Sequence, residues 1–158
     1  MNYEVTIGLE VHVQLKTRSK MFCGCATQAG AEPNTQICPV CLGYPGTLPA
    51  LNRETVRLGA MAGMLLDCEI ARVSKFDRKS YFYPDVAKNY QITQYPFPIC
   101  LGGHLDVTEG GRTRRIGITR IHLEEDVAKS THHANFSGVD FNRCGVPLME
   151  LVTEPELA

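Results

Sequence analysis

Residues 5–15 alternate between apolar positions and positions that are polar or glycine. Every odd position from Val5 to Leu15 is apolar, whereas the even positions carry Thr, Gly, Glu, His and Gln. A period of two over this length predicts a half-buried β-strand with its odd side in the core. On the even side, Glu10 and His12 stand about 7 Å apart along the strand. These two side chains either lie on a solvated face or hold a divalent cation.

The next regular pattern follows Asn52, a residue type favoured as a helix N-cap. The first turn after it is polar, and the remainder is apolar on nearly every side. This pattern predicts a helix over residues 53–66 that is buried on most of its surface. Gly59 and Gly63 would let the helix pack closely against a sheet.

Two alternating segments on either side of a Gly-Gly turn at 110–111 predict a β-hairpin. Its second strand runs into three successive acids, Glu124, Glu125 and Asp126. Because adjacent residues of a strand face opposite sides, one of Glu124 and Glu125 should point inward, where a carboxylate is costly unless it is paired or binds a metal. One or both of these glutamates would complete an oxygen-rich magnesium site with the polar face of the first strand.

The last patterned segment begins at residue 146. Residues 146–153 predict a short strand, and Pro147 near its start is typical of a strand beginning or a sheet edge. Glu154–Leu157 resembles the first turn of a helix, with Pro155 at the favoured first helical position. We expect this helix to continue in a longer protein of which the chain is a fragment.

Seven cysteines change this picture, because four of them fall in two close pairs. Cys23 and Cys25 are separated by one residue, and Cys38 and Cys41 by two, with twelve residues between the pairs. Four thiolates in about twenty residues are typical of a closed, tetrahedral structural zinc site. We therefore expect residues 21–45 to form a zinc-binding segment, with free thiols as the alternative. The remaining cysteines are isolated, and we expect them to be packing residues: Cys68, Cys100 and Cys144.

The composition is that of an ordinary globular protein of 158 residues, with 44% hydrophobic and 21% charged residues and a net charge of −1. The sequence shows neither a secretory signal nor the run of about 20 apolar residues that a membrane helix needs. We therefore expect a cytosolic protein with no membrane partner. The patterns together predict one α+β domain, made of a mostly antiparallel β-sheet, a buried helix and a four-cysteine zinc-knuckle segment.

Residues 72–94 interleave cations with aromatic side chains. Arg78 and Lys79 belong to a group of four cations within eight residues, and Tyr81, Lys88 and further aromatics follow. Such a segment offers donors for phosphate or carboxylate and rings that can stack on a base. The alternative is a solvated loop anchored by buried tyrosines.

Five long stretches of the chain resemble the B subunits of the aspartyl/glutamyl-tRNA amidotransferases. They follow one another over almost the whole chain: Ile7–Leu15, Gly30–Asn34, Lys75–Asp85, Tyr90–Gln94 and Ile116–Asp126. Those subunits are much longer. The resemblance implies that residues 1–158 are the N-terminal part of a catalytic "cradle" domain, and that the helical and tRNA-binding tail domains are absent from this chain.

The resemblance also implies a function, that of a ligase in protein biosynthesis. In this family the B chain uses ATP to phosphorylate the side-chain carboxylate of Glu-tRNA(Gln) or Asp-tRNA(Asn), and ammonia from a glutaminase subunit then displaces phosphate. The implied partners are the amidase-type A subunit, the small C subunit and the acceptor end of the aminoacyl-tRNA. The implied cofactors are ATP, Mg²⁺ and a structural Zn²⁺.

Site residues carried over from the family fall into four sets. The implied catalytic residues are Glu10, His12, Lys79, Tyr81, Lys88, Glu124 and Glu125. Arg78 and Lys79 would bind ATP, and Glu10, His12 and Glu125 would bind magnesium. The zinc ligands would be Cys23, Cys25, Cys38 and Cys41. Because family members draw further acidic ligands from beyond this segment, we expect the chain alone to be inactive.

Three alternatives compete with this interpretation. A zinc-ribbon module would bind nucleic acid or protein through the cysteine segment, although the near-neutral charge argues against it. A stand-alone metal-dependent phosphohydrolase would use Glu10, His12 and the two adjacent glutamates without partners. The archaeal paralogue of the B subunit, which serves glutamine only, is the third.

Overall fold

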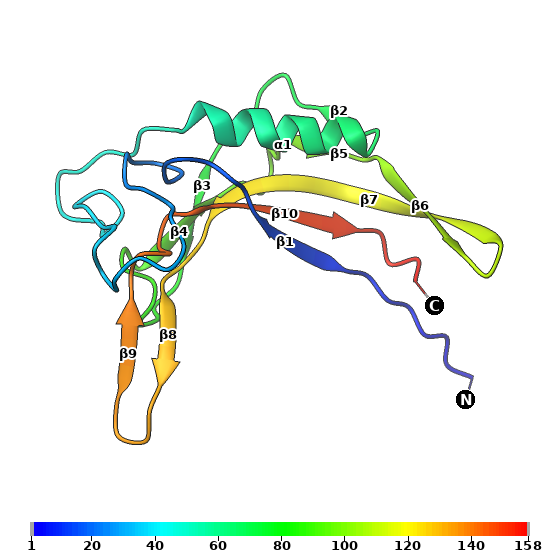
Figure 1. The fold of residues 1–158 in the computed structure, drawn as a ribbon. Helices are drawn as coiled ribbons and strands as arrows, with labels where there is room; N and C mark the ends of the chain where they lie inside the picture. The colour runs from blue at the N-terminus through cyan, green and yellow to red at the C-terminus, as the bar shows by residue number, and fades with distance from the viewer. Residues whose placement is uncertain (1, 158) are drawn as a thin grey trace.

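The computed structural model describes residues 2–157, and its centre is a six-stranded sheet built around the long strand β7. The strand order is β1-β10-β7-β5-β2, with β6 pairing to the far end of β7 (Figure 1). All of these pairings are antiparallel. The strands of this sheet are β1 (Glu10–Gln14), β2 (Glu69–Ile70), β5 (Cys100–Leu101), β6 (His104–Glu109), β7 (Arg112–Glu125) and β10 (Pro147–Thr153).

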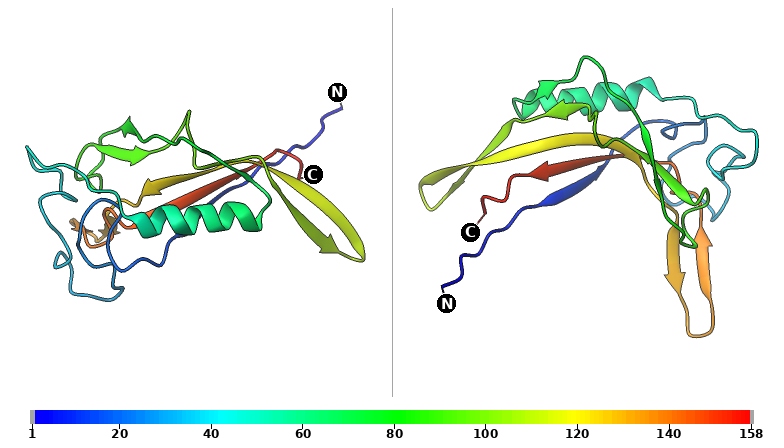
Figure 2. Two further views of the ribbon diagram at one scale, coloured as in Figure 1. Left: turned by 90° about the horizontal axis from the view of Figure 1, so that it is seen from above. Right: turned by 180° about the vertical axis from the view of Figure 1, so that it is seen from behind.

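Two small antiparallel sheets flank the central one. β3 (Asp77–Ser80) pairs with β4 (Tyr90–Thr93), and this pair lies against the end of β7. β8 (Lys129–His132) and β9 (Ser137–Asp140) form a hairpin that projects away from the body of the protein (Figure 2). The predicted α+β class with a mostly antiparallel sheet is therefore confirmed.

One helix, α1 (Arg53–Leu65), covers one face of the sheet (Figure 1). The predicted cap is present, since the Asn52 side chain accepts a hydrogen bond of 2.9 Å from the backbone N–H of Glu54. The helix approaches the sheet closely, because a Cβ atom on Gly59 would lie only 2.8 Å from the Leu123 side chain. The prediction that most of the helix is buried is wrong, since the side away from the sheet is open and Leu65 is 83% exposed.

The hydrophobic core lies between α1 and the middle of the sheet. Its largest completely buried apolar side chains are Met21, Ile121 and Leu123, and Met149 of β10 packs beside them. Two of the cysteines predicted as packing residues, Cys100 and Cys144, are buried, and Cys68 is half-buried beside the core. The sheet therefore has one apolar side under the helix and one side free to carry polar groups.

The first strand is shorter and more exposed than its sequence predicts. β1 begins only at Glu10 and pairs with β10 alone, so it is the edge of the sheet. Its apolar side is not in a core: Val11 and Val13 are 42% and 41% exposed, and Val5 is 65% exposed. The alternation correctly predicts a strand, but α1 packs over β7, β5 and β2 rather than over β1, which leaves these residues uncovered.

The predicted helical turn at residues 154–157 is also absent. Leu157 instead forms an antiparallel bridge with Ile7, so the segment after β10 runs beside the segment before β1. No helix among residues 2–157 is long and apolar enough to cross a membrane.

Candidate functional site

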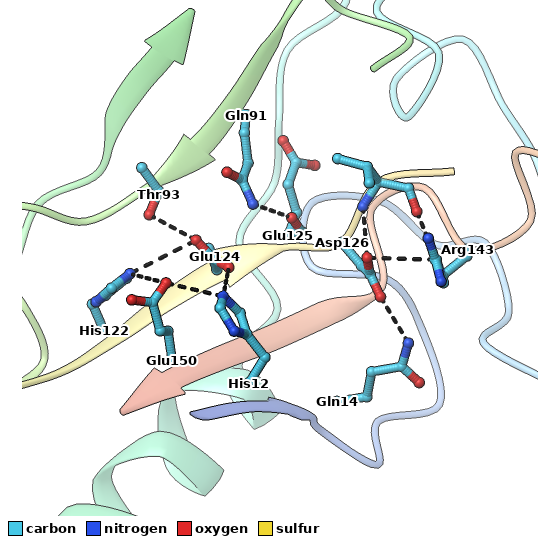
Figure 3. Close-up of polar contacts among 11 residues, drawn as sticks. His12, Gln14, Gln91, Thr93, His122, Glu124, Glu125, Asp126, Arg143 and Glu150 are labelled. Carbon is cyan, nitrogen blue, oxygen red and sulfur yellow. Dashed lines mark hydrogen bonds and ion pairs between the residues drawn. The ribbon is translucent and has the colours of Figure 1, made fainter. Parts of the chain in front are cut away.

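A row of polar side chains crosses three neighbouring strands on the side of the sheet away from α1. His12 of β1 stands opposite Glu150 of β10, and Glu150 stands opposite His122 of β7. Glu150 Oε2 lies 3.0 Å from His12 Nε2 and 3.3 Å from His122 Nε2 (Figure 3). The antiparallel register therefore brings together residues that are distant in the sequence.

Glu124 joins this row from the same face of β7. Its Oε1 lies 3.3 Å from His12 Nε2, and its Oε2 accepts a hydrogen bond of 3.2 Å from the Thr93 hydroxyl of β4. One ligand atom from each of His12, Glu124 and Glu150 lies within 4.8 Å of the others, close enough for one ion to bridge them. Two carboxylates and one imidazole suit a hard or borderline divalent cation.

Glu124 is kept ionised by its neighbours although it is only 4% exposed. Burial alone raises the pKa of its carboxyl, but the interactions with His122, whose Nε2 lies 3.7 Å from Glu124 Oε2, and with His12 outweigh it, so that its pKa lies below the usual value. His122 is itself buried, and its Nδ1 has no hydrogen-bond partner among the described residues. The carboxylate is thus prepared to act as a metal ligand near neutral pH.

The predicted residue Glu10 lies on the rim of this cluster rather than within it. It is exposed on β1 and borders a cavity of about 430 Å³ together with Arg78, Lys79 and Arg120. Arg78 places its guanidinium over the ring of Tyr90, 4.4 Å from the centroid. Glu124 and Glu150, the two carboxylates of the cluster, also line this cavity, which therefore combines cations with anions.

A second open cavity, of about 420 Å³, shares Lys79, Glu124 and Glu150 with the first. Tyr81 and Gln91 also line it. Burial raises the pKa of the Tyr81 hydroxyl, and nearby carboxylates raise it further, so Tyr81 keeps its proton and can donate a hydrogen bond. Lys79 therefore stands where the two cavities meet.

Glu125 does not reach the cluster, because it faces the opposite side of β7 from Glu124 (Figure 3). Its Oε1 forms an ion pair with Lys88 and accepts a hydrogen bond of 3.0 Å from the backbone N–H of Ile92. The Glu125 and Lys88 side chains are 4% and 8% exposed. The structure thus brings His12 and Glu124 together but places Glu125 and Lys88 in a separate buried pair.

Behind this pair lies a cavity of about 220 Å³ that extends to the cysteine segment. Its lining includes Glu125 and Lys88 as well as Lys20 and Cys41. Glu125 lines this cavity, whereas its neighbour Glu124 belongs to the cluster on the open face.

The cysteine segment gathers all four predicted zinc ligands. One sulfur from each of Cys23, Cys25, Cys38 and Cys41 lies within 4.8 Å of the others. Four thiolates about 2.3 Å from one zinc ion would span a similar distance, so the sulfurs fit a tetrahedral site. The hydrogen bond between Cys23 and Cys41 favours a thiol at Cys23 and a thiolate at Cys41. It is the main cause that lowers the pKa of Cys41 to about 4, and together with burial it raises the pKa of Cys23.

Sequence reasoning missed two members of the open cluster, Glu150 and His122. A signal for each was present. Glu150 is the one carboxylate within the apolar strand 146–153, and His122 shares its parity with Glu124. Neither signal identifies a partner, because the partner depends on which strands pair and in which register.

The chain is similar to known proteins over nearly its whole length. Residues 5–158 match the family described as "GatB/GatE catalytic domain". Curated relatives described as the B subunits of aspartyl/glutamyl-tRNA(Asn/Gln) amidotransferases are 57% identical in Caldicellulosiruptor saccharolyticus, 58% in Thermodesulfovibrio yellowstonii and 56% in Frankia casuarinae. These alignments cover 98–99% of this chain but only 32–33% of each relative, so the chain spans about one third of their length.

Proposed function

Because the chain belongs to the GatB/GatE catalytic-domain family, we propose that it is the first part of the catalytic domain of the B subunit in a tRNA-dependent amidotransferase. The reaction is the amidation of Glu-tRNA(Gln) or Asp-tRNA(Asn). The γ-phosphoryl group of ATP is transferred to the side-chain carboxylate of the aminoacyl group, and ammonia then forms the amide and releases phosphate. The family match extends far beyond the cysteine segment, which argues against a zinc-ribbon module.

The metal that this chemistry needs is best held by His12, Glu124 and Glu150. A divalent ion there would neutralise charge that develops on phosphate oxygens. Glu10 lies close enough along β1 to contribute through the adjacent cavity. Glu125, which the sequence suggested as a magnesium ligand, is replaced in this proposal by Glu124 and Glu150, because it faces away from His12.

The two open cavities offer separate places for the two substrates. The cavity with Arg78, Lys79 and Arg120 supplies cations for the phosphates of ATP. The cavity with Tyr81 supplies a neutral hydrogen-bond donor for the aminoacyl end of the tRNA. Lys79 lines both cavities and would hold the phosphoryl group as it passes from one substrate to the other.

The buried pair of Lys88 and Glu125 suits the arrival of ammonia. The cavity behind it is small and polar, and the Glu125 carboxylate can accept a hydrogen bond from ammonia on its way to the open face. Ammonia would come from an amidase-type A subunit, which together with a small C subunit would complete a cytoplasmic enzyme. The four cysteines would hold a structural zinc ion away from the reacting atoms.

The observation that carries this proposal is that His12, Glu124 and Glu150 converge between two cavities. One of these cavities is lined by cations and the other by the Tyr81 hydroxyl. The test is Glu124→Gln in the full-length subunit, assembled with its partner subunits. ATP-dependent amidation should fall by about 10²–10³-fold, as for loss of a group that stabilises developing charge. Glutaminase activity, measured separately, should persist.

Glu109→Gln is a matched control, because Glu109 is an exposed glutamate at the tip of the β6–β7 hairpin. This variant should amidate at the unaltered rate. If Glu124→Gln also amidates normally, the catalytic assignment of the cluster is wrong.

A further inference from the structure

Lys20 is a completely buried lysine beside the cysteine cluster, with no exposed surface. Its Nζ lies 3.6 Å from Cys41 Sγ and 3.3 Å from the carbonyl oxygen of Phe141. Among residues 2–157 it has no salt bridge to a carboxylate, and the buried ion pair nearby is formed by Lys88 instead. An ammonium group held in this way needs a source of negative charge, because burial of an unpaired charge is costly.

The four cysteines can provide that charge. A divalent ion bound by four thiolates carries a net charge of −2. At the buried sulfur of Cys41, where water cannot offset this charge, a cation close to the sulfur can balance it. Lys20 is the lysine whose ammonium group contacts one of these sulfurs. Hydrogen bonds from neighbouring groups to metal ligands commonly alter metal affinity about 10- to 100-fold.

The main chain at Lys20 joins the other half of the cluster. Its N–H donates to the carbonyl oxygen of Cys25 at 2.9 Å, so Lys20 contacts one member of each cysteine pair. Its side chain passes Gly145, where a Cβ atom would lie 3.5 Å from Lys20 Cδ and 3.7 Å from Glu125 Oε2. Lys20 thus links both halves of the cysteine cluster to the wall of the cavity that contains Glu125.

We propose that Lys20 is a positioning residue whose buried ammonium group balances the charge of the metal–tetrathiolate and so retains the metal. The proposal rests on metal binding by the four cysteines, which belongs to the proposed function. Lys20 is not itself a ligand of the ion. Its charge, and not its size, determines how firmly the ion is held.

The test compares Lys20→Met with Lys20→Arg in the full-length subunit, purified with its metal. Zinc content is measured by elemental analysis, and zinc release by transfer to an excess of a coloured chelator. Lys20→Met should release zinc about 10- to 100-fold faster than the unaltered protein. Lys20→Arg, which keeps the charge, should stay within about threefold, as should Lys16→Met, in which an exposed lysine is replaced.

Thermal unfolding with and without zinc gives a second measurement. The rise in Tm on zinc binding should be smaller in Lys20→Met than in the unaltered protein, because a ligand stabilises the fold according to its affinity, whereas Lys20→Arg should keep the full rise. A residue that only fills space would change the Tm of the metal-free and the zinc-loaded protein alike. If Lys20→Met does not fold, Lys20→Gln is used in the same release assay. It removes the same charge and keeps a hydrogen-bond donor.

Three results would overturn the role of Lys20: unchanged zinc release in the neutral variants, equally fast release from Lys20→Arg, or an undiminished rise in Tm on zinc binding in Lys20→Met. An unaltered protein that contains no zinc would instead remove the premise about the four cysteines, and the inference with it.

Discussion

The two candidate metal sites of this chain are assembled in opposite ways. The cysteine cluster comes from four residues within one loop segment, whereas His12, Glu124 and Glu150 come from three strands that are distant in the sequence. The first set depends on local spacing and the second on sheet register. The residues between the two cysteine pairs are all exposed or half-buried, but the strand cluster lies on a sheet that main-chain hydrogen bonds hold in place. Loss of metal should therefore disturb the two sites very differently.

The largest effect is expected from Cys41→Ser. Cys41 is the most buried of the four cysteines and also accepts a 3.2 Å hydrogen bond from the backbone N–H of Cys38. The variant should lose zinc and the fixed structure of residues 23–41, because the folding of such segments depends on the metal. Hydrogen exchange should show loss of protection there, with β7 and β10 still protected. Retained protection in the segment would contradict this expectation.

A smaller and more local effect is expected from Glu150→Gln. It removes one charged ligand from the strand cluster but leaves the pairing of β1, β10 and β7 intact, so the fold should remain. Affinity for Mn²⁺, used as a paramagnetic probe, should fall at least about tenfold. Loss of a group that only hydrogen-bonds to a metal ligand already lowers metal affinity by about this factor. Glu10→Gln, on the rim, should reduce it less. Equal losses would place Glu10 among the direct ligands.

The smallest effect concerns the attachment of the cysteine segment to β9. Asp140 Oδ1 accepts hydrogen bonds from the backbone N–H of Asn142 at 2.9 Å and of Asn34 at 3.0 Å. The bond from Asn142 is the main cause that lowers the pKa of the Asp140 carboxyl, and the bond from Asn34, which attaches the cysteine segment, lowers it further. Both bonds are therefore present above the ordinary aspartate range and are lost as pH falls through the lowered pKa. The NMR shift of the Asn142 amide should titrate below pH 3.8, and Asp140→Asn should abolish that transition.

What could be predicted from the sequence follows the same division between local and distant contacts. The Asn52 cap, the turn at 110–111 and the cysteine spacing each involve neighbours in the chain, and their structural consequences are present. The role of Glu150 depends on its position opposite His12 and His122, which only the strand order determines. The site therefore required the fold before its members could be assembled.

The errors have physical causes as well. Alternation identified the first strand but could not show that α1 would cover β7 and leave Val11 and Val13 exposed. Parity correctly indicated that Glu124 and Glu125 face opposite sides, but it could not determine which side holds His12. Glu125 shares the parity of the core residue Leu123, yet it finds a cation in Lys88 rather than a metal ligand set.

The adjacency of Glu124 and Glu125 on β7 has a consequence for how this chain can vary. One peptide unit separates a carboxylate on the open face from a carboxylate in the internal cavity. A single-residue insertion or deletion between Ile118 and Leu123 would exchange the two sides and turn core side chains outward. Substitutions along this stretch change one group at a time, but a change in length would alter both compartments at once. We therefore expect natural length variation to be confined to the hairpin tips and the loops.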